Sequence, residues 1–194
     1  MNYKNEIRNL IIEASKVADR PLTDNDFEIV HQSLNHIPLK LPKGKMAVYT
    51  FLYKGKFLKI GQANFKSNAR YQSQHYNLGI ARSTLAKILT NDPEMTPLIN
   101  QENLSDWIKK NCERFDVIIN AELGKNTLNF IEGLLHYKYN PKYEGWKLLY
   151  GFILFVKNDI LNIEIVNDLR KKLLKKYENC MHFIHNTEKI HAFH

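Results

Sequence analysis

The sequence predicts an α+β fold built on a small, mainly antiparallel sheet of three strands flanked by helices. Apolar runs at Met46–Phe51 and Phe57–Gly61 are separated by Lys54-Gly55, a turn signal, and this pattern is typical of a β-hairpin. The segment Arg114–Asn120 alternates along its length and indicates the third strand. Longer segments around these strands repeat their apolar residues with the period of a helix.

The composition and charge suit a globular protein with a polyanionic partner. The chain has 194 residues, of which 44% are hydrophobic and 25% charged, so a domain with a substantial core is expected. Its net charge of +8 favours nucleic acid as the partner, although a basic surface can also serve solubility alone. Cys112 and Cys180 lack CxxC spacing, which argues against a zinc site or disulfide framework and fits reduced thiols in the cytoplasm.

Residues 1–45 are expected to form an N-terminal helical extension. Apolar residues recur with helical spacing over residues 1–18, Pro21 ends this helix, and Thr23 can cap a second one. The buried face of the second helix is predicted to be Phe27, Val30 and Leu34. Two short helices also fit a helix-turn-helix, but their polar faces carry no cluster of Arg or Asn for reading bases, so packing elements or a dimer surface are favoured.

Neither a signal peptide nor a membrane span is predicted. The N-terminus carries acidic residues among its apolar ones and has no continuous apolar region. The longest apolar run, Leu148–Val156, is interrupted by Gly151 and is too short to cross a bilayer. We therefore expect no membrane partner and a cytoplasmic protein.

The segment after the hairpin is unusually rich in groups that bind phosphate or stack on bases. A polar loop, Gln62–Lys66, leads into a predicted helix, and further helices are expected at Ser83–Leu89 and Glu102–Lys110. The first of these helices would present five side chains of interest: Arg70, Tyr71, Gln74, His75 and Tyr76. A hairpin does not need this many such groups in order to fold.

A long helix, Lys125–Tyr139, is predicted after the third strand, and Asn140-Pro141 ends it. Glu132 lies in the middle of this helix among apolar neighbours, so its carboxylate must reach the edge of the core or find a cation. Residues 148–194 are expected to be a C-terminal helical extension and tail, with a helix at Ile160–Tyr177.

Five elements in order resemble the GIY-YIG nuclease superfamily, in which two hairpin strands carry Gly-Ile-Tyr and Tyr-Ile-Gly. An arginine, a glutamate and an Asn before a Pro follow in that family. The matching elements here are Ala47-Val48-Tyr49, Lys59-Ile60-Gly61, Arg70, Glu132 and Asn140-Pro141. Ala47 replaces the first glycine and Lys59 the second tyrosine, and lysine still offers a cation to a phosphate. The resemblance assigns residues 46–147 to a GIY-YIG-like nuclease domain.

The resemblance implies a divalent-metal-dependent DNA endonuclease, of a restriction or phage-defence type, that would pair as a homodimer to cut both strands. Mg²⁺ or Mn²⁺ would be bound through Glu132, and no small-molecule cofactor is expected. The implied catalytic residues are Tyr49, Lys59, Arg70, His75 and Glu132. The implied contacts to nucleic acid are Gly61, Tyr71, Gln74, Tyr76 and Asn140.

The chemistry of these groups supports phosphodiester hydrolysis. Arg70 and Lys59 would bind phosphoryl oxygens, and Tyr49 would orient or deprotonate the attacking water if nearby cations lower its pKa. His75 is the acid–base candidate because histidine titrates near neutrality. Each group also has a structural interpretation, such as a salt bridge for Glu132, and a catalytically inactive nucleic-acid-binding protein is the alternative function.

Overall fold

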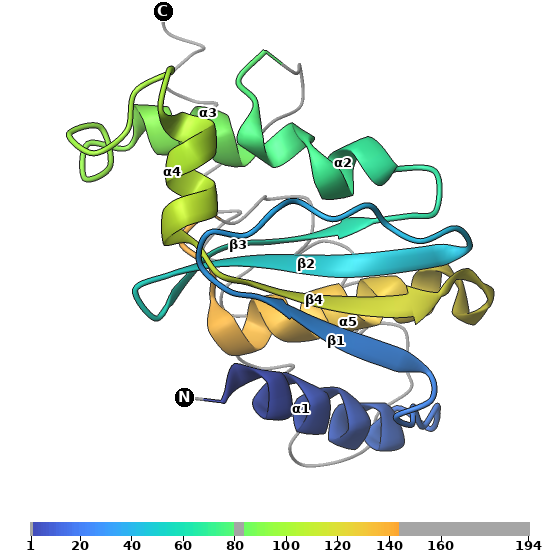
Figure 1. Ribbon diagram of the computed structural model, residues 1–194. Helices are drawn as coiled ribbons and strands as arrows, with labels where there is room; N and C mark the ends of the chain where they lie inside the picture. Colours follow the sequence, from blue (N-terminus) through green and yellow to red (C-terminus); the bar gives the residue numbers. More distant parts are fainter. Residues whose placement is uncertain (1, 80–83, 144–194) are drawn as a thin grey trace, which may run out of the picture.

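The computed structural model describes residues 2–79 and 84–143 and contains, within them, one antiparallel sheet and five α-helices (Figure 1). The strand order is β1-β4-β2-β3. The strands are β1 (Phe27–Gln32), β2 (Lys45–Tyr53), β3 (Lys56–Ala63) and β4 (Arg114–Asn120). The helices are α1 (Tyr3–Val17), α2 (Asn68–Gln72), α3 (Thr84–Asn91), α4 (Leu104–Asn111) and α5 (Gly124–Tyr139), with 3₁₀ turns at Gln74–Tyr76 and Ala121–Leu123.

Helices cover both faces of the sheet (Figure 1). Helices α1 and α5 pack on one face, while α2, α3 and α4 lie over the other. Each face has its own apolar core. No helix among the described residues is both long and apolar enough to cross a bilayer. The α+β class and most predicted elements are therefore confirmed.

The predicted hairpin is confirmed. It consists of β2 and β3, with β2 next to β4 and β3 at the edge of the sheet. Its strands pair in antiparallel register with Tyr49 opposite Gly61, and a β-bulge follows Phe51. Lys54 and Gly55 form the turn with φ angles of 48° and 76°. A glycine suits this left-handed conformation because it has no Cβ to clash with the backbone.

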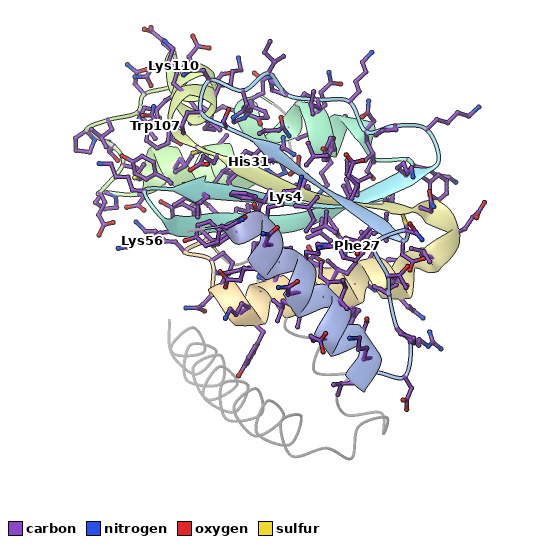
Figure 2. All side chains as sticks on the ribbon, turned by 60° about the horizontal axis from the view of Figure 1, so that its bottom comes forward. Lys4, Phe27, His31, Lys56, Trp107 and Lys110 are labelled. Atoms are coloured by element: carbon purple, nitrogen blue, oxygen red, sulfur yellow. The ribbon has the colours of Figure 1, made fainter. Side chains whose placement is uncertain are left out.

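The second predicted helix is wrong, because Phe27–Gln32 is strand β1 and pairs with β4. The Asp26 carboxylate accepts hydrogen bonds from the amide and hydroxyl of Thr23, so these two residues close a turn instead of capping a helix. Phe27 and Ile29 of β1 are buried while Glu28 between them is exposed, and Phe27 lies at one end of the strand in Figure 2. The sheet consequently has four strands, not three, and the helix-turn-helix interpretation loses its second helix.

Residues 1–45 are thus not a purely helical extension, since they contribute one strand to the sheet as well as α1. Other predictions lie outside the described residues. These are the cap at Ser83, the helix at Ile160–Tyr177, and the tail within 148–194.

After α5 the chain turns and follows the outer edge of β3. Asn140 ends the helix in the left-handed conformation, with φ 42°, and its amide donates to the His136 carbonyl. The amides of Lys142 and Tyr143 then donate to the carbonyls of Phe57 and Leu58, at 2.9 and 2.8 Å. The His136 imidazole lies 3.2 Å from the Ile60 carbonyl.

A fully buried ion pair lies between the sheet and α2. Arg114 and Asp116 both point from β4 toward the α2 face, and their side chains are 3.0 Å apart and inaccessible to solvent. Asp116 also accepts hydrogen bonds from the Tyr71 hydroxyl at 2.8 Å and from the Gln32 amide at 2.6 Å. The carboxylate therefore joins β4 to β1 and to α2.

The guanidinium of Arg114 extends this network to the turn after α2. It donates to the Tyr71 carbonyl at 3.3 Å and to the Tyr76 hydroxyl at 3.0 Å. The Tyr76 hydroxyl lies 2.7 Å from Nε2 of His36, in the segment between β1 and β2. Burial and the Arg114 charge lower the pKa of His36 to about 4, so its neutral ring can accept this hydrogen bond.

Asp116→Ala should lower the free energy of unfolding by about 3–5 kcal/mol, because it leaves the buried charge of Arg114 without its carboxylate. Urea denaturation followed by circular dichroism measures the effect. Asp106→Ala is the matched control, since it removes an exposed carboxylate 3.4 Å from Lys109 and should cost less than about 1 kcal/mol. Equal losses in the two variants would contradict a structural role for the buried pair.

Candidate active site

The predicted hairpin and helix residues meet at the β3 side of the sheet. Tyr49 on β2 is completely buried, and its hydroxyl accepts a hydrogen bond of 3.2 Å from Nε of Arg70 on α2. Arg70 is an exposed residue, so the hydrogen bond links the buried hydroxyl to a residue at the protein surface. This hydrogen bond brings the two candidate residues Tyr49 and Arg70 together.

Gly61 lies directly against the ring of Tyr49. A Cβ at this position would be 2.5 Å from the Tyr49 hydroxyl oxygen and 2.7 Å from the ring carbon that bears it. Real Cβ atoms do not approach other heavy atoms this closely. Glycine at the end of the second motif therefore provides the space in which the Tyr49 hydroxyl reaches Arg70.

Burial raises the pKa of Tyr49 above its ordinary value, although the Arg70 charge and hydrogen bond oppose this. The condition for a phenolate, that nearby cations bring this pKa below its ordinary value, is not met, because burial outweighs their effect. Tyr49 is accordingly a neutral phenol at neutral pH. Because its oxygen accepts from Arg70, its own proton is available for donation to another acceptor.

Glu132 reaches β3 from the opposite face of the sheet, where α5 packs on β2 and β3. It is fully buried, and Oε2 accepts a hydrogen bond of 2.7 Å from the Gln62 amide. The same amide donates to Asn129 at 3.0 Å, which holds it over the carboxylate. Oε1 of Glu132 has no hydrogen-bond partner among the described residues.

The carboxylate of Glu132 is strongly affected by its surroundings. Burial raises its pKa to about 7, while Arg70, the Gln62 hydrogen bond and Lys59 act in the opposite direction. Lys59, on β3, is itself buried. The positive charges of Arg70 and Lys59 therefore act on the Glu132 carboxylate.

His75 differs from its prediction. Its ring is buried and packs against Tyr49 and Phe51, at centroid distances of 4.7 and 5.4 Å. Burial and the charges of Arg114, Lys59 and Arg70 lower its pKa well below the ordinary value. The expected titration near neutrality is therefore wrong, and acid–base catalysis by His75 stays a prediction that these contacts do not support.

The predicted nucleic-acid contacts are only partly placed at a surface. Tyr71 and Tyr76 are buried in the Arg114 network, so neither ring is exposed to a base, and this placement does not support their predicted role. Gln74 is partly exposed. Asn140 is exposed but lies two helical turns beyond Glu132, about 12 Å along α5.

Sequence reasoning missed Gln62 and Asn129, which hold the candidate carboxylate. Gln62 was placed in a loop, whereas it belongs to β3 and pairs with Val48. Alternation along the strand was the available signal, because it puts Gln62 on the opposite face from Gly61 and Ala63 and hence toward α5.

The side chains near Glu132 suit only a cation that takes few ligands from the protein. No group of three or more His, Cys, Asp and Glu side chains in residues 2–79 and 84–143 is placed to hold a metal. Glu132 nevertheless offers a buried oxygen without a partner, and Mg²⁺ keeps most of its ligands as water. A single-carboxylate magnesium site is compatible with these residues.

In comparisons with known proteins, the chain matches no family model, no curated protein and no solved structure.

Gly61→Ala should destabilise the fold by about 1–3 kcal/mol, because the new methyl group must displace the Tyr49 ring from a packed core. Thermal or urea unfolding measures this loss. Gly79→Ala serves as the control, since a Cβ there meets nothing within 4 Å. A change at Gly61 no larger than that at Gly79 would show that Tyr49 is not fixed against β3.

Glu132→Gln should make the protein more stable than the wild type at pH 7 and remove part of its pH dependence. The carboxyl ionises near 4.5 in the unfolded chain but near 7 in the folded one, so its protonated form favours folding at low pH. Between these pH values the wild type should lose about 3 kcal/mol relative to the variant.

Urea unfolding at several pH values in chelator-containing buffer measures this difference. Glu122→Gln, at an exposed position, is the matched control and should track the wild type. If the free energies of unfolding of the wild type and of Glu132→Gln change in parallel with pH, the raised pKa of the buried Glu132 carboxyl would be contradicted.

Proposed function

We propose that the chain is a divalent-metal-dependent DNA endonuclease of the GIY-YIG type, which hydrolyses phosphodiester bonds at the β3 side of the sheet. One observation carries the proposal. Tyr49, Arg70 and Glu132 come from three separate elements, yet Arg70 is hydrogen-bonded to Tyr49 and the charges of Arg70 and Glu132 shift the pKa of Tyr49 and of each other. These are the positions that the sequence resemblance selects.

Arg70 would bind the scissile phosphate. Arg70 is an exposed residue whose Nε donates to Tyr49, so its remaining N–H groups can bind other acceptors. The Tyr49 oxygen and the Glu132 carboxylate keep its pKa above the ordinary value although burial opposes the charge. The cation is thus permanent, and Lys59 adds a second positive charge nearby.

Tyr49 would orient the reaction rather than act as a base. Its raised pKa keeps the proton on the phenol, and Arg70 occupies one acceptor position of its oxygen. The hydroxyl can then donate to a phosphoryl oxygen or to the attacking water. Of the two predicted roles of Tyr49, orienting the attacking water needs no phenolate, whereas deprotonating it does.

Glu132 would hold the metal through its unpartnered Oε1. When bound there, Mg²⁺ or Mn²⁺ would neutralise charge on the phosphoryl group and lower the pKa of a water ligand. The Gln62 amide keeps the other oxygen in place. Cation binding favours the ionised carboxylate, which otherwise has a pKa near neutrality.

The net charge of +8 favours DNA as the substrate, and cutting both strands would require a homodimer or two successive events. A catalytically inactive, nucleic-acid-binding protein is the second candidate. The complete burial of Glu132 favours it, because a metal and its waters need access to the carboxylate. The departures at Ala47 and Lys59 point the same way.

Supercoiled plasmid incubated with the protein and Mg²⁺ should be converted to nicked or linear DNA. Glu132→Gln and Arg70→Ala should each slow cleavage by about 10²–10³-fold, because each removes charge stabilisation of the phosphoryl group. Gel electrophoresis over time measures the rates, and chelation of the metal should abolish cleavage.

Glu122→Gln and Arg8→Ala are matched controls that alter the same residue types at exposed positions away from the site, and they should cleave at the wild-type rate. Cleavage that survives Glu132→Gln would refute the metal assignment. Tight DNA binding without cleavage in the wild type would select the inactive binding protein.

A further inference from the structure

A groove of about 740 Å³ lies at the turn end of the hairpin, separate from the candidate site. None of its lining residues is Tyr49, Arg70 or Glu132. It is bounded by the start of α1, the hairpin turn, residues 94–95 and the end of α5. Figure 2 shows Lys56 at this end of the sheet.

Aromatic rings form much of the groove wall. Tyr53, at the end of β2, and Tyr139, at the end of α5, both line the groove and are half-buried. Phe57 stacks on Tyr139 with ring centroids 4.2 Å apart, and Tyr3 meets Phe57 edge-on at 5.3 Å. Rings that are partly exposed and held in place by other rings are stacking surfaces for planar groups such as nucleobases.

The charged residues of the lining leave an excess of positive charge. The groove is lined by four lysines and two glutamates. Both glutamates are paired with a lysine of the groove, since Glu6 lies 3.5 Å from Lys138 and Glu94 lies 2.6 Å from Lys142. These two pairs neutralise each other, so the net charge of the lining comes from the other two lysines.

Those two lysines, Lys54 and Lys56, lie at the hairpin turn. Both are exposed, and neither forms an ion pair with a carboxylate among residues 2–79 and 84–143. The ammonium of Lys54 lies 5.2 Å from the centre of the Tyr53 ring, so positive charge is placed directly beside an aromatic wall. This combination suits a ligand that carries both flat rings and negative charges.

An unpaired nucleic-acid strand has this chemistry. Its bases offer their faces to aromatic side chains while its phosphates contact cations. A duplex keeps its bases stacked inside, and an acidic peptide would leave the rings without planar partners. The groove volume of about 740 Å³ lies within the range of pockets that enclose a drug-sized ligand, which a nucleotide resembles in size.

We propose that this groove binds an unpaired DNA strand, whose bases stack on Tyr53 and Tyr139 and whose phosphates contact Lys54 and Lys56. The inference deepens the proposed nuclease function and rests on it for the identity of the strand as DNA. It gives a function to a cationic and aromatic surface that the candidate active site does not use.

The position of the groove relates it to the candidate site. Lys56 begins β3, and Gly61 lies further along the same strand. At the rise of an extended chain their separation is about 17 Å. Roughly five nucleotides span this distance at a spacing of about 3.4 Å. The proposed nuclease would therefore act on DNA in which an unpaired segment adjoins the cut.

Fluorescence anisotropy of the full-length chain tests the proposal. The probe is a labelled single-stranded DNA of about 12 nucleotides, in buffer that contains chelator and no metal. Lys54→Gln with Lys56→Gln should weaken binding at least about tenfold at low salt. Because two phosphate contacts are lost, the slope of log K against log salt concentration should become shallower by about 1.4.

Lys87→Gln with Lys110→Gln is the matched control. It removes the same charge at exposed positions outside the groove, and should leave the affinity within about twofold and the slope unchanged. Equal losses in the two double variants would overturn the proposal. A duplex of the same length that binds as tightly as the single strand would overturn the assignment of an unpaired strand. Competition by a poly-glutamate peptide as strong as that of the unlabelled DNA would overturn it in favour of an acidic protein partner.

Photocrosslinking locates the strand directly. The same oligonucleotide carries 5-iododeoxyuridine, which on irradiation joins to an aromatic side chain that stacks on it, and mass spectrometry identifies the residue. Crosslinks are expected at Tyr53 or Tyr139, whereas Tyr137, an exposed tyrosine outside the groove, should not react. Crosslinks confined to residues outside the groove would overturn the proposal. Both measurements need no metal, so failure of the proposed nuclease activity would not alter their results.

Discussion

The buried pair of Arg114 and Asp116 is the interaction on which the arrangement of the α2 side depends. The carboxylate and the guanidinium are both inaccessible to solvent. They form hydrogen bonds with residues of β1, of α2 and of the 3₁₀ turn that follows α2, as well as with each other on β4. A buried charge is tolerable only when such partners are in place. Since Arg70 precedes Tyr71, the network that fixes Tyr71 also fixes where the Arg70 guanidinium emerges.

The candidate site is assembled from both faces of one edge strand, β3. β3 has α2 near one face and α5 against the other, so Tyr49 with Arg70 and Gln62 with Glu132 approach the same strand from opposite sides. Gly61 leaves room on this strand for the Tyr49 ring. This geometry explains why residues so distant in sequence affect one another's pKa values.

The spacing of apolar residues was sufficient to predict the elements in which it matches the residues that are buried in the structure. The hairpin, β4 and α5 were predictable, and the apolar flanks of Glu132 correctly indicated a buried carboxylate. Residues 27–32 were not, because Phe27 and Val30 fit helical spacing while Phe27 and Ile29 fit a strand, and pairing with β4 decided between the two. The depth of His75 and the contact between Gln62 and Glu132 depend on packing between distant segments, which no local pattern encodes.

The path of the chain after α5 has a consequence for how molecules of this protein meet. An exposed edge strand offers unpaired carbonyls and amides to any other extended chain, and thereby seeds association through added strands. Here the amides of Lys142 and Tyr143 and the ring of His136 already occupy carbonyls of β3. This part of β3 is therefore protected from pairing with a strand of another molecule. A homodimer formed by strand pairing would have to use a different edge.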